Sequence, residues 1–140
     1  MYATDNEGSW RQLGEFVESF PDDHEYWSRW KPMAREVLAS LEKHATTPLF
    51  RAGQSMHHIV FSTLDRHGLE AEPRVTLEFH PDRDLVRVAY SDGNLYFCTP
   101  QSEISVSPNR AVPVILGYMR RLWIETKPDV PLPAALDGDN

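Results

Sequence analysis

The sequence has few of the residues that mark secreted, membrane or nucleotide-binding proteins. Its single cysteine, Cys98, cannot form a disulfide within the chain, so a reducing compartment such as the cytoplasm is expected. No apolar run approaches the length that crosses a bilayer, and the N-terminus lacks the basic and apolar regions of a signal peptide. The seven glycines are scattered singly, so no glycine-rich phosphate loop is present. We therefore expect a cytoplasmic protein that engages no membrane and no cofactor.

Basic residues are scarce at the start of the chain. Residues 1–25 hold seven acidic residues against one basic residue, Arg11, so this segment carries −6 of the formal net charge of −7. The rest of the chain is nearly neutral. An acidic surface repels phosphate, which argues against a nucleic-acid partner, and it attracts basic protein surfaces. We expect the partner to be another protein with a basic surface.

Apolar residues recur at helical spacing in three segments. The first begins after Ser9, which can cap a helix, and the second follows residues 22–23. The third begins near residue 107. Pro32 lies inside the second segment and predicts a kink, or the end of one helix and the start of another. Pro113 is expected in the first turn of the third helix, unless the helix starts near Pro113.

Between the second and third helical segments the apolar pattern changes to that of β-strands. The sequence predicts strands at residues 49–52, 56–64, 74–80, 85–90, 95–99 and 104–106. Asp92-Gly93 is a strong hairpin signal that would pair the fourth of these strands with the fifth.

The order of the predicted elements indicates a fold class. Helices come first, strands follow, and a helix comes last, which is typical of an α+β fold. We expect N-terminal helices, a central antiparallel β-meander of four or five strands, and a C-terminal helix packed on one face of the sheet. Residues 1–127 should form one domain, and the proline-containing residues 128–140 a poorly ordered tail.

The acidic N-terminal region also carries aromatic residues that suit a binding surface. Tyr26 and Trp27 are adjacent on a helix, so both cannot lie at the centre of one buried stripe. An exposed tryptophan ringed by acids suits a hot spot for a basic partner. Alternatively, the acids form a solvated face and Trp27 belongs to the core. The residues predicted to bind the partner are Glu15, Glu18, Asp22, Asp23, Glu25 and Trp27. Reversing the first three of them to lysine should leave the fold intact, because exposed charges contribute little to stability.

Histidines offer an alternative, which is an enzyme or small-ligand site. His57 and His58 are adjacent on a predicted strand, so their side chains point to opposite faces. One of them could approach His80 on the next predicted strand. The alternative pocket would lie between sheet and helices and be lined by His58, His80 and Tyr90.

Metal ligation and nucleophilic catalysis have weaker support. Asp82 and Asp84 follow the predicted histidine site, but they have a sufficient explanation as turn residues. No ligand spacing typical of a transition-metal site occurs. Cys98 on a strand has no neighbouring base and fits a small buried apolar group. We expect no bound metal and no catalytic residue.

Size and charge, with no catalytic motif, favour a non-enzymatic protein-binding domain. Small acidic proteins of this kind often neutralise a partner, as immunity proteins and antitoxins do, or escort one, as secretion chaperones do. The expected mechanism is occlusion, in which an acidic helical face with an aromatic anchor covers a basic surface. Two alternatives stay open: the ligand-binding or enzymatic protein described above, and a structural homodimer that pairs through its sheet edge or its third helix.

Overall fold

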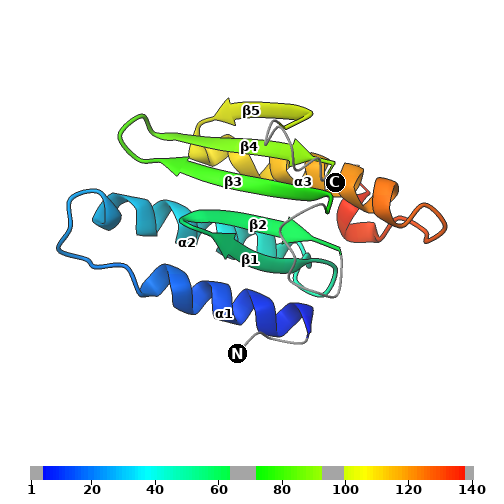
Figure 1. Cartoon of the computed structure of the whole chain (residues 1–140), viewed down its shortest axis with the longest axis horizontal. Coiled ribbons are helices and arrows are strands. Elements are labelled where there is room, and N and C mark those ends of the chain that lie inside the picture. Colours follow the sequence, from blue (N-terminus) through cyan, green and yellow to red (C-terminus); the bar gives the residue numbers. More distant parts are fainter. Residues whose placement is uncertain (1–4, 64–71, 93–99, 138–140) are drawn as a thin grey trace.

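The computed structural model of the chain describes residues 5–63, 72–92 and 100–137. Two helices come first, then a five-stranded antiparallel sheet whose strands follow one another in chain order, then a helix and a short 3-10 helix (Figure 1). This arrangement confirms the predicted α+β fold with its central meander. The elements are α1 (Asn6–Glu18), α2 (Trp27–Lys43), β1 (Arg51–Ser55), β2 (His58–Ser62), β3 (Arg74–His80), β4 (Leu85–Ser91), β5 (Ser102–Val106), α3 (Pro108–Thr126) and η1 (Ala134–Leu136).

The helices α2 and α3 lie side by side behind the sheet, and α1 lies along the edge formed by β1 (Figure 1). Side chains alternate along β3 and β4, so that Leu77 and Val88 are cross-strand neighbours in the core. Their neighbours Glu78 and Arg87 pair on the opposite face of the sheet. The alternation seen in the sequence therefore separates a face covered by helices from an open, polar face.

The first helix begins earlier than the sequence predicts, because Asp5 rather than Ser9 caps it. The Asp5 carboxylate accepts a hydrogen bond from a backbone amide in the first turn. Ser9 lies within the helix, where its hydroxyl accepts a hydrogen bond of 2.9 Å from the backbone amide of Ala52. The indole of Trp10 donates to the carbonyl of Phe50 at 2.9 Å. Both bonds attach α1 to β1 and to the residue that precedes it.

Two prolines lie inside continuous helices. Pro32 does not end α2, and Pro113 lies beyond the first turn of α3, where Pro108 takes the first position instead. The prediction that Pro113 belongs to the first turn is therefore wrong. Both interior prolines are exposed, so water can reach the carbonyl groups that they leave unpaired.

The strands differ from the predicted ones mainly at the first hairpin. Met56, with a φ of 56°, and His57 form the turn between β1 and β2, so the predicted strand at 56–64 begins later. The predicted strand at 95–99, which contains Cys98, lies outside the described residues. The predicted turn residue Gly93 lies outside them as well. Among the described strands, β4 pairs with β5, which contains the last predicted strand.

Residues 134–136, after the third helix, return to the core. A poorly ordered tail is expected from residue 128, but residues 134–136 form η1, which packs against α3. Leu136 is 2 % exposed and belongs to the core cluster. Burial of this apolar side chain stabilises the segment, although its proline content had indicated an unfolded tail.

Two helical glycines have no packing role within the part of the fold that the structure describes. A methyl group added at Gly14 in α1 or at Gly117 in α3 would meet no neighbouring atom within 4 Å. Alanine has a higher helix propensity than glycine by about 1 kcal/mol. Gly14→Ala and Gly117→Ala should each raise the free energy of unfolding by roughly that amount in urea denaturation. A loss of stability in either variant would contradict an unstrained helical backbone at that position.

Candidate partner-binding site

Aromatic rings gather where α1 ends and α2 begins. Pro21 follows the end of α1, and the short connection to α2 brings the rings of the two helices together. The rings of Phe20 and Trp27 stack with centroids 4.2 Å apart. Trp30 and Tyr26 meet Trp27 edge to face at 5.5 and 4.8 Å. These contacts fix the indole of Trp27 in one position.

The side chain of Trp27 is half-buried, so it is neither a fully exposed residue nor a member of the sealed core. Its neighbour Trp30 takes the core position and is completely buried. His57, from the β1–β2 turn, packs on Trp27 with centroids 5.8 Å apart. Next to His57, Met56 is 81 % exposed. A partly exposed apolar surface therefore extends from the start of α2 to this turn.

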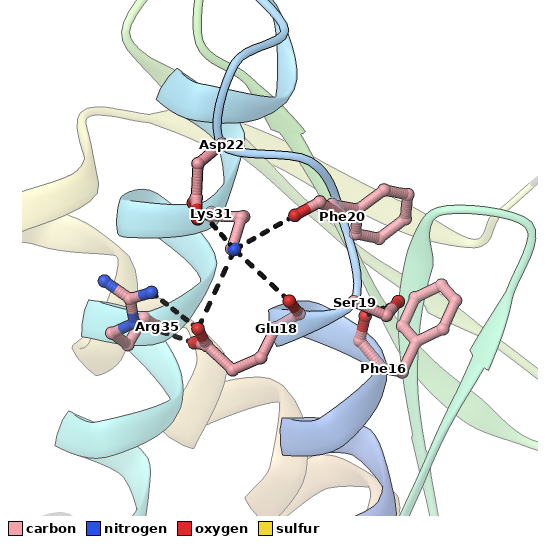
Figure 2. A network of polar contacts seen from close by, with 7 residues as sticks. All are labelled: Phe16, Glu18, Ser19, Phe20, Asp22, Lys31 and Arg35. Carbon is pink, nitrogen blue, oxygen red and sulfur yellow. Dashed lines mark hydrogen bonds and ion pairs between the residues drawn. The ribbon is translucent and has the colours of Figure 1, made fainter.

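A buried lysine joins α1 to α2 beside the aromatic rings (Figure 2). The side chain of Lys31 is 5 % exposed, and its ammonium group donates to the carbonyls of Glu18 and Phe20 at 3.2 and 3.0 Å. It also donates to the carboxylate of Asp22 at 2.8 Å. The last carbonyls of a helix have no partner within it, so Lys31 caps the end of α1.

Two of the predicted partner-binding acids are engaged within the protein (Figure 2). Arg35 holds Glu18 in a two-point contact, with nitrogen–oxygen distances of 2.8 and 2.7 Å. The hydrogen bond from Arg35 lowers the pKa of Glu18, and the hydrogen bond from Lys31 lowers the pKa of Asp22. Lysines in place of Glu18 and Asp22 would stand against Lys31 and Arg35, which argues against the expectation that reversing these acids leaves the fold intact.

The remaining acids are free to face a partner. Within residues 5–63, 72–92 and 100–137, Glu15, Asp23 and Glu25 have no ion-pair partner, and each is exposed. Asp23 and Glu25 lie in the connection that leads to Trp27. We use the name aromatic–acidic surface for Asp23, Glu25, Trp27 and Met56.

The histidines of the alternative pocket meet on the open face of the sheet. The Nε2 atoms of His58 and His80 lie 3.1 and 2.8 Å from the two carboxylate oxygens of Glu78. Arg87 lies 3.6 Å from the same carboxylate. Burial lowers the pKa of His58 and outweighs the opposite effect of the nearby Glu78 carboxylate. Burial thus favours the neutral form of His58.

Tyr90 does not join these histidines. It pairs with Val75 on the face of the sheet covered by helices, where its hydroxyl donates to Glu125 and Arg121 lies over its ring at 4.1 Å. Burial, and then the hydrogen bond to Glu125, raise the pKa of Tyr90. The three residues of the predicted pocket therefore lie on two sides of the sheet.

The structure offers no cluster of metal-ligating residues in the described part of the chain. Asp82 and Asp84 lie in the turn between β3 and β4, as their turn chemistry predicts. Cys98, which the sequence favours as a small buried apolar group over a nucleophile, lies outside the described residues.

A groove of about 670 Å³ lies between α2, α3 and η1. Apolar side chains line much of it, including Val37 and Leu116, with Arg120 and Glu36 among its polar residues. Sequence reasoning missed it. The available signal was in α3, where two prolines and a glycine, residues 108, 113 and 117, all line this groove.

Comparisons with models of protein families, with curated proteins and with solved structures find no match. Within the described residues, the helices are too short or too polar to cross a bilayer.

Proposed function

We propose that this chain is a non-enzymatic protein-binding domain that covers a basic surface of a partner protein with its aromatic–acidic surface. The observation that carries the proposal is the setting of Trp27. Its indole is half-buried and held by Phe20, Tyr26 and Trp30, and two unpaired acids, Asp23 and Glu25, precede it in the chain. A rigid aromatic side chain loses little entropy on binding, and tryptophan is enriched among residues that dominate interface energies.

The charges around Trp27 support a basic partner. Asp23 and Glu25 carry negative charge that no described cation compensates. Lys31 and Arg35 neutralise Glu18 and Asp22, so the attraction comes from fewer acids than the sequence predicts. Such exposed acids act mainly on the rate at which a basic partner associates.

Immunity proteins and antitoxins neutralise a partner protein and secretion chaperones escort one, and the proposal extends to that class and to the cytoplasm. Cytoplasmic location rests on the single cysteine. The alternative small-ligand site is less supported, because His58 and His80 lie on the opposite side of the sheet from Tyr90.

The steering role of the acids predicts a specific kinetic effect. In Glu15→Lys, Asp23→Lys and Glu25→Lys combined, association should slow by about tenfold at low salt, and the difference should shrink as salt rises, because salt screens exposed charges. The measurement is surface plasmon resonance at two salt concentrations, against a partner captured from a lysate of the native host.

A matched variant separates position from net charge. Glu42→Lys, Asp129→Lys and Asp137→Lys make the same change in net charge at exposed sites that lie neither on α1 nor in the connection between α1 and α2. This control should associate close to the wild-type rate. Equal slowing in both triple variants would reduce the effect to net charge and refute a localised binding face.

A further inference from the structure

The groove between α2 and α3 has the size and shape of a ligand site. Its volume of about 670 Å³ lies within the usual range for sites that hold small organic molecules. Four α3 residues that line it, 108, 112, 116 and 120, recur at intervals of four and so form one stripe. Twelve residues of helix span about 18 Å, which makes the groove elongated.

The floor and walls of the groove are largely apolar. Val37 from α2, Val112 and Leu116 from α3, and Leu136 from η1 all line it. Leu136 belongs to the buried core, whereas Val112 and Leu116 are only partly covered. An elongated apolar body would bury the exposed parts of these side chains.

Charge is distributed unevenly along the groove. The helices α2 and α3 run in the same direction behind the sheet (Figure 1). Glu36 therefore lies toward one end of the groove, and His44, eight residues later, lies toward the end where Arg120 stands. Eight residues of helix correspond to about 12 Å. The groove thus has an acidic end and a cationic end with apolar residues between them.

Arg120 is available to an incoming anion. It makes no hydrogen bond or ion pair with any described residue, in contrast to Arg121, which pairs with Glu125 at 3.2 Å. His44 donates through Nδ1 to the carbonyl of Ser40 at 2.9 Å, so its other ring nitrogen remains for a ligand. An arginine binds carboxylate groups in a two-point geometry.

Gly117 lies in the same groove, on the turn of α3 that precedes Arg120. Open space stands where its side chain would be, and no described neighbour requires a glycine there. A glycine in a helix weakens that helix. Contact with a bound molecule accounts for a small residue at this position, because a larger side chain would occupy the groove.

We infer that the groove between α2 and α3 binds a free organic monocarboxylate with a single elongated apolar body. The apolar body lies on Val37, Val112, Leu116 and Leu136, and the carboxylate meets Arg120 at the cationic end. Glu36 disfavours the reverse orientation, because it would repel the carboxylate. This inference is independent of the aromatic–acidic surface, whose residues lie in the connection before α2, at the first residue of α2 and in the β1–β2 turn.

The test uses three probes with the same eight-carbon body: octanoate, 1-octanol and octyltrimethylammonium. Titration of the full chain at pH 8 is followed by amide chemical shifts, and Arg120 carries the positive charge. Octanoate should bind saturably, at least five times more tightly than 1-octanol, and octyltrimethylammonium should bind most weakly. The shifted amides should belong to α2, α3 and η1.

Variants locate the site. Arg120→Gln should reduce octanoate affinity to that of 1-octanol, and Gly117→Leu should abolish binding of both by filling the groove. Gly14→Leu, a glycine substitution on a different helix, should bind octanoate as the wild type does. Circular dichroism and thermal melts verify that each variant is folded, and Gly117→Ala, which partly fills the groove, should weaken binding if Gly117→Leu does not fold.

Several results would overturn the inference. They are an absence of saturable octanoate binding, equal affinities for the three probes, tighter binding of the cation than of the anion, and shifts confined to other elements. Unchanged octanoate affinity in folded Arg120→Gln would also overturn it. None of these outcomes depends on the identity of a protein partner. Failure of this inference would therefore not contradict the proposed function, and failure of the proposed function would not contradict this inference.

Discussion

Replacing Lys31 by methionine should lower the free energy of unfolding by about 3 kcal/mol. Methionine retains the unbranched apolar stem of lysine but cannot donate to the carbonyls of Glu18 and Phe20 or to Asp22. Hydrogen bonds that involve a charged group contribute about 1.5–3 kcal/mol each, and the carbonyls at the end of α1 would lose their donor. Urea denaturation with a two-state fit gives the change.

Arg35→Met is the matched control for this prediction. Arg35 lies one turn after Lys31 on α2 and binds the same Glu18, but its side chain is exposed. Exposed ion pairs contribute about 0–1 kcal/mol, so this variant should stay within about 1 kcal/mol of the wild type. Similar losses of unfolding free energy in both variants would show that the buried Lys31 stabilises the end of α1 no more than the exposed Arg35 does.

Trp27→Ala should increase the rate of dissociation from the partner by about 30-fold. That factor corresponds to about 2 kcal/mol, the usual threshold for a hot-spot residue, and changes at one interface act mainly on dissociation. Because Trp27 is only half-buried, its loss should cost less stability than the roughly 3–5 kcal/mol typical of a core tryptophan. Surface plasmon resonance measures the dissociation rate, and urea denaturation measures the free energy of unfolding.

The comparison residue is Trp30, which is completely buried. Trp30→Phe should reduce stability while leaving the dissociation rate of the folded protein near the wild-type value. A Trp27→Ala variant that loses as much stability as a core substitution and dissociates at the wild-type rate would assign Trp27 to the core alone. The partner would then have to bind elsewhere.

The fold was predictable because its strongest patterns are local. The strict alternation from Arg74 to His80 depends on which side chains face the core, so the sequence alone reveals it. Boundaries were less predictable, because they depend on single residues. Asp5 caps α1 in place of Ser9, and the positive φ of Met56 turns the chain before β2 begins.

The candidate site was only partly predictable. Trp27 and the acids near it were identified from their position in the chain, but the role of Lys31 depends on how α1 packs against α2. A count of charges treats every lysine as exposed, whereas Lys31 is buried and offsets the charge of Asp22 and Glu18, whose side chains stay exposed. No local pattern marks a lysine that caps a different helix.

The residues of the alternative pocket could not be placed on one face of the sheet without knowing the register between strands. His80 and Val75 are five residues apart in β3, so their side chains point to opposite faces. Tyr90 pairs with Val75, which places it on the face opposite His80. Strand alternation gave the face of each residue within its own strand, but only the register between β3 and β4 shows which faces coincide.

The meander has a consequence for how the chain assembles. Each strand pairs with its neighbours along the sequence, so the sheet requires mainly short loop closures. The long closures belong to the helices: the bonds from Ser9 and Trp10 of α1 to the region of β1 span 43 and 40 residues. Most of the entropy lost in joining distant parts of the chain is therefore associated with docking helices onto the sheet, and not with forming it.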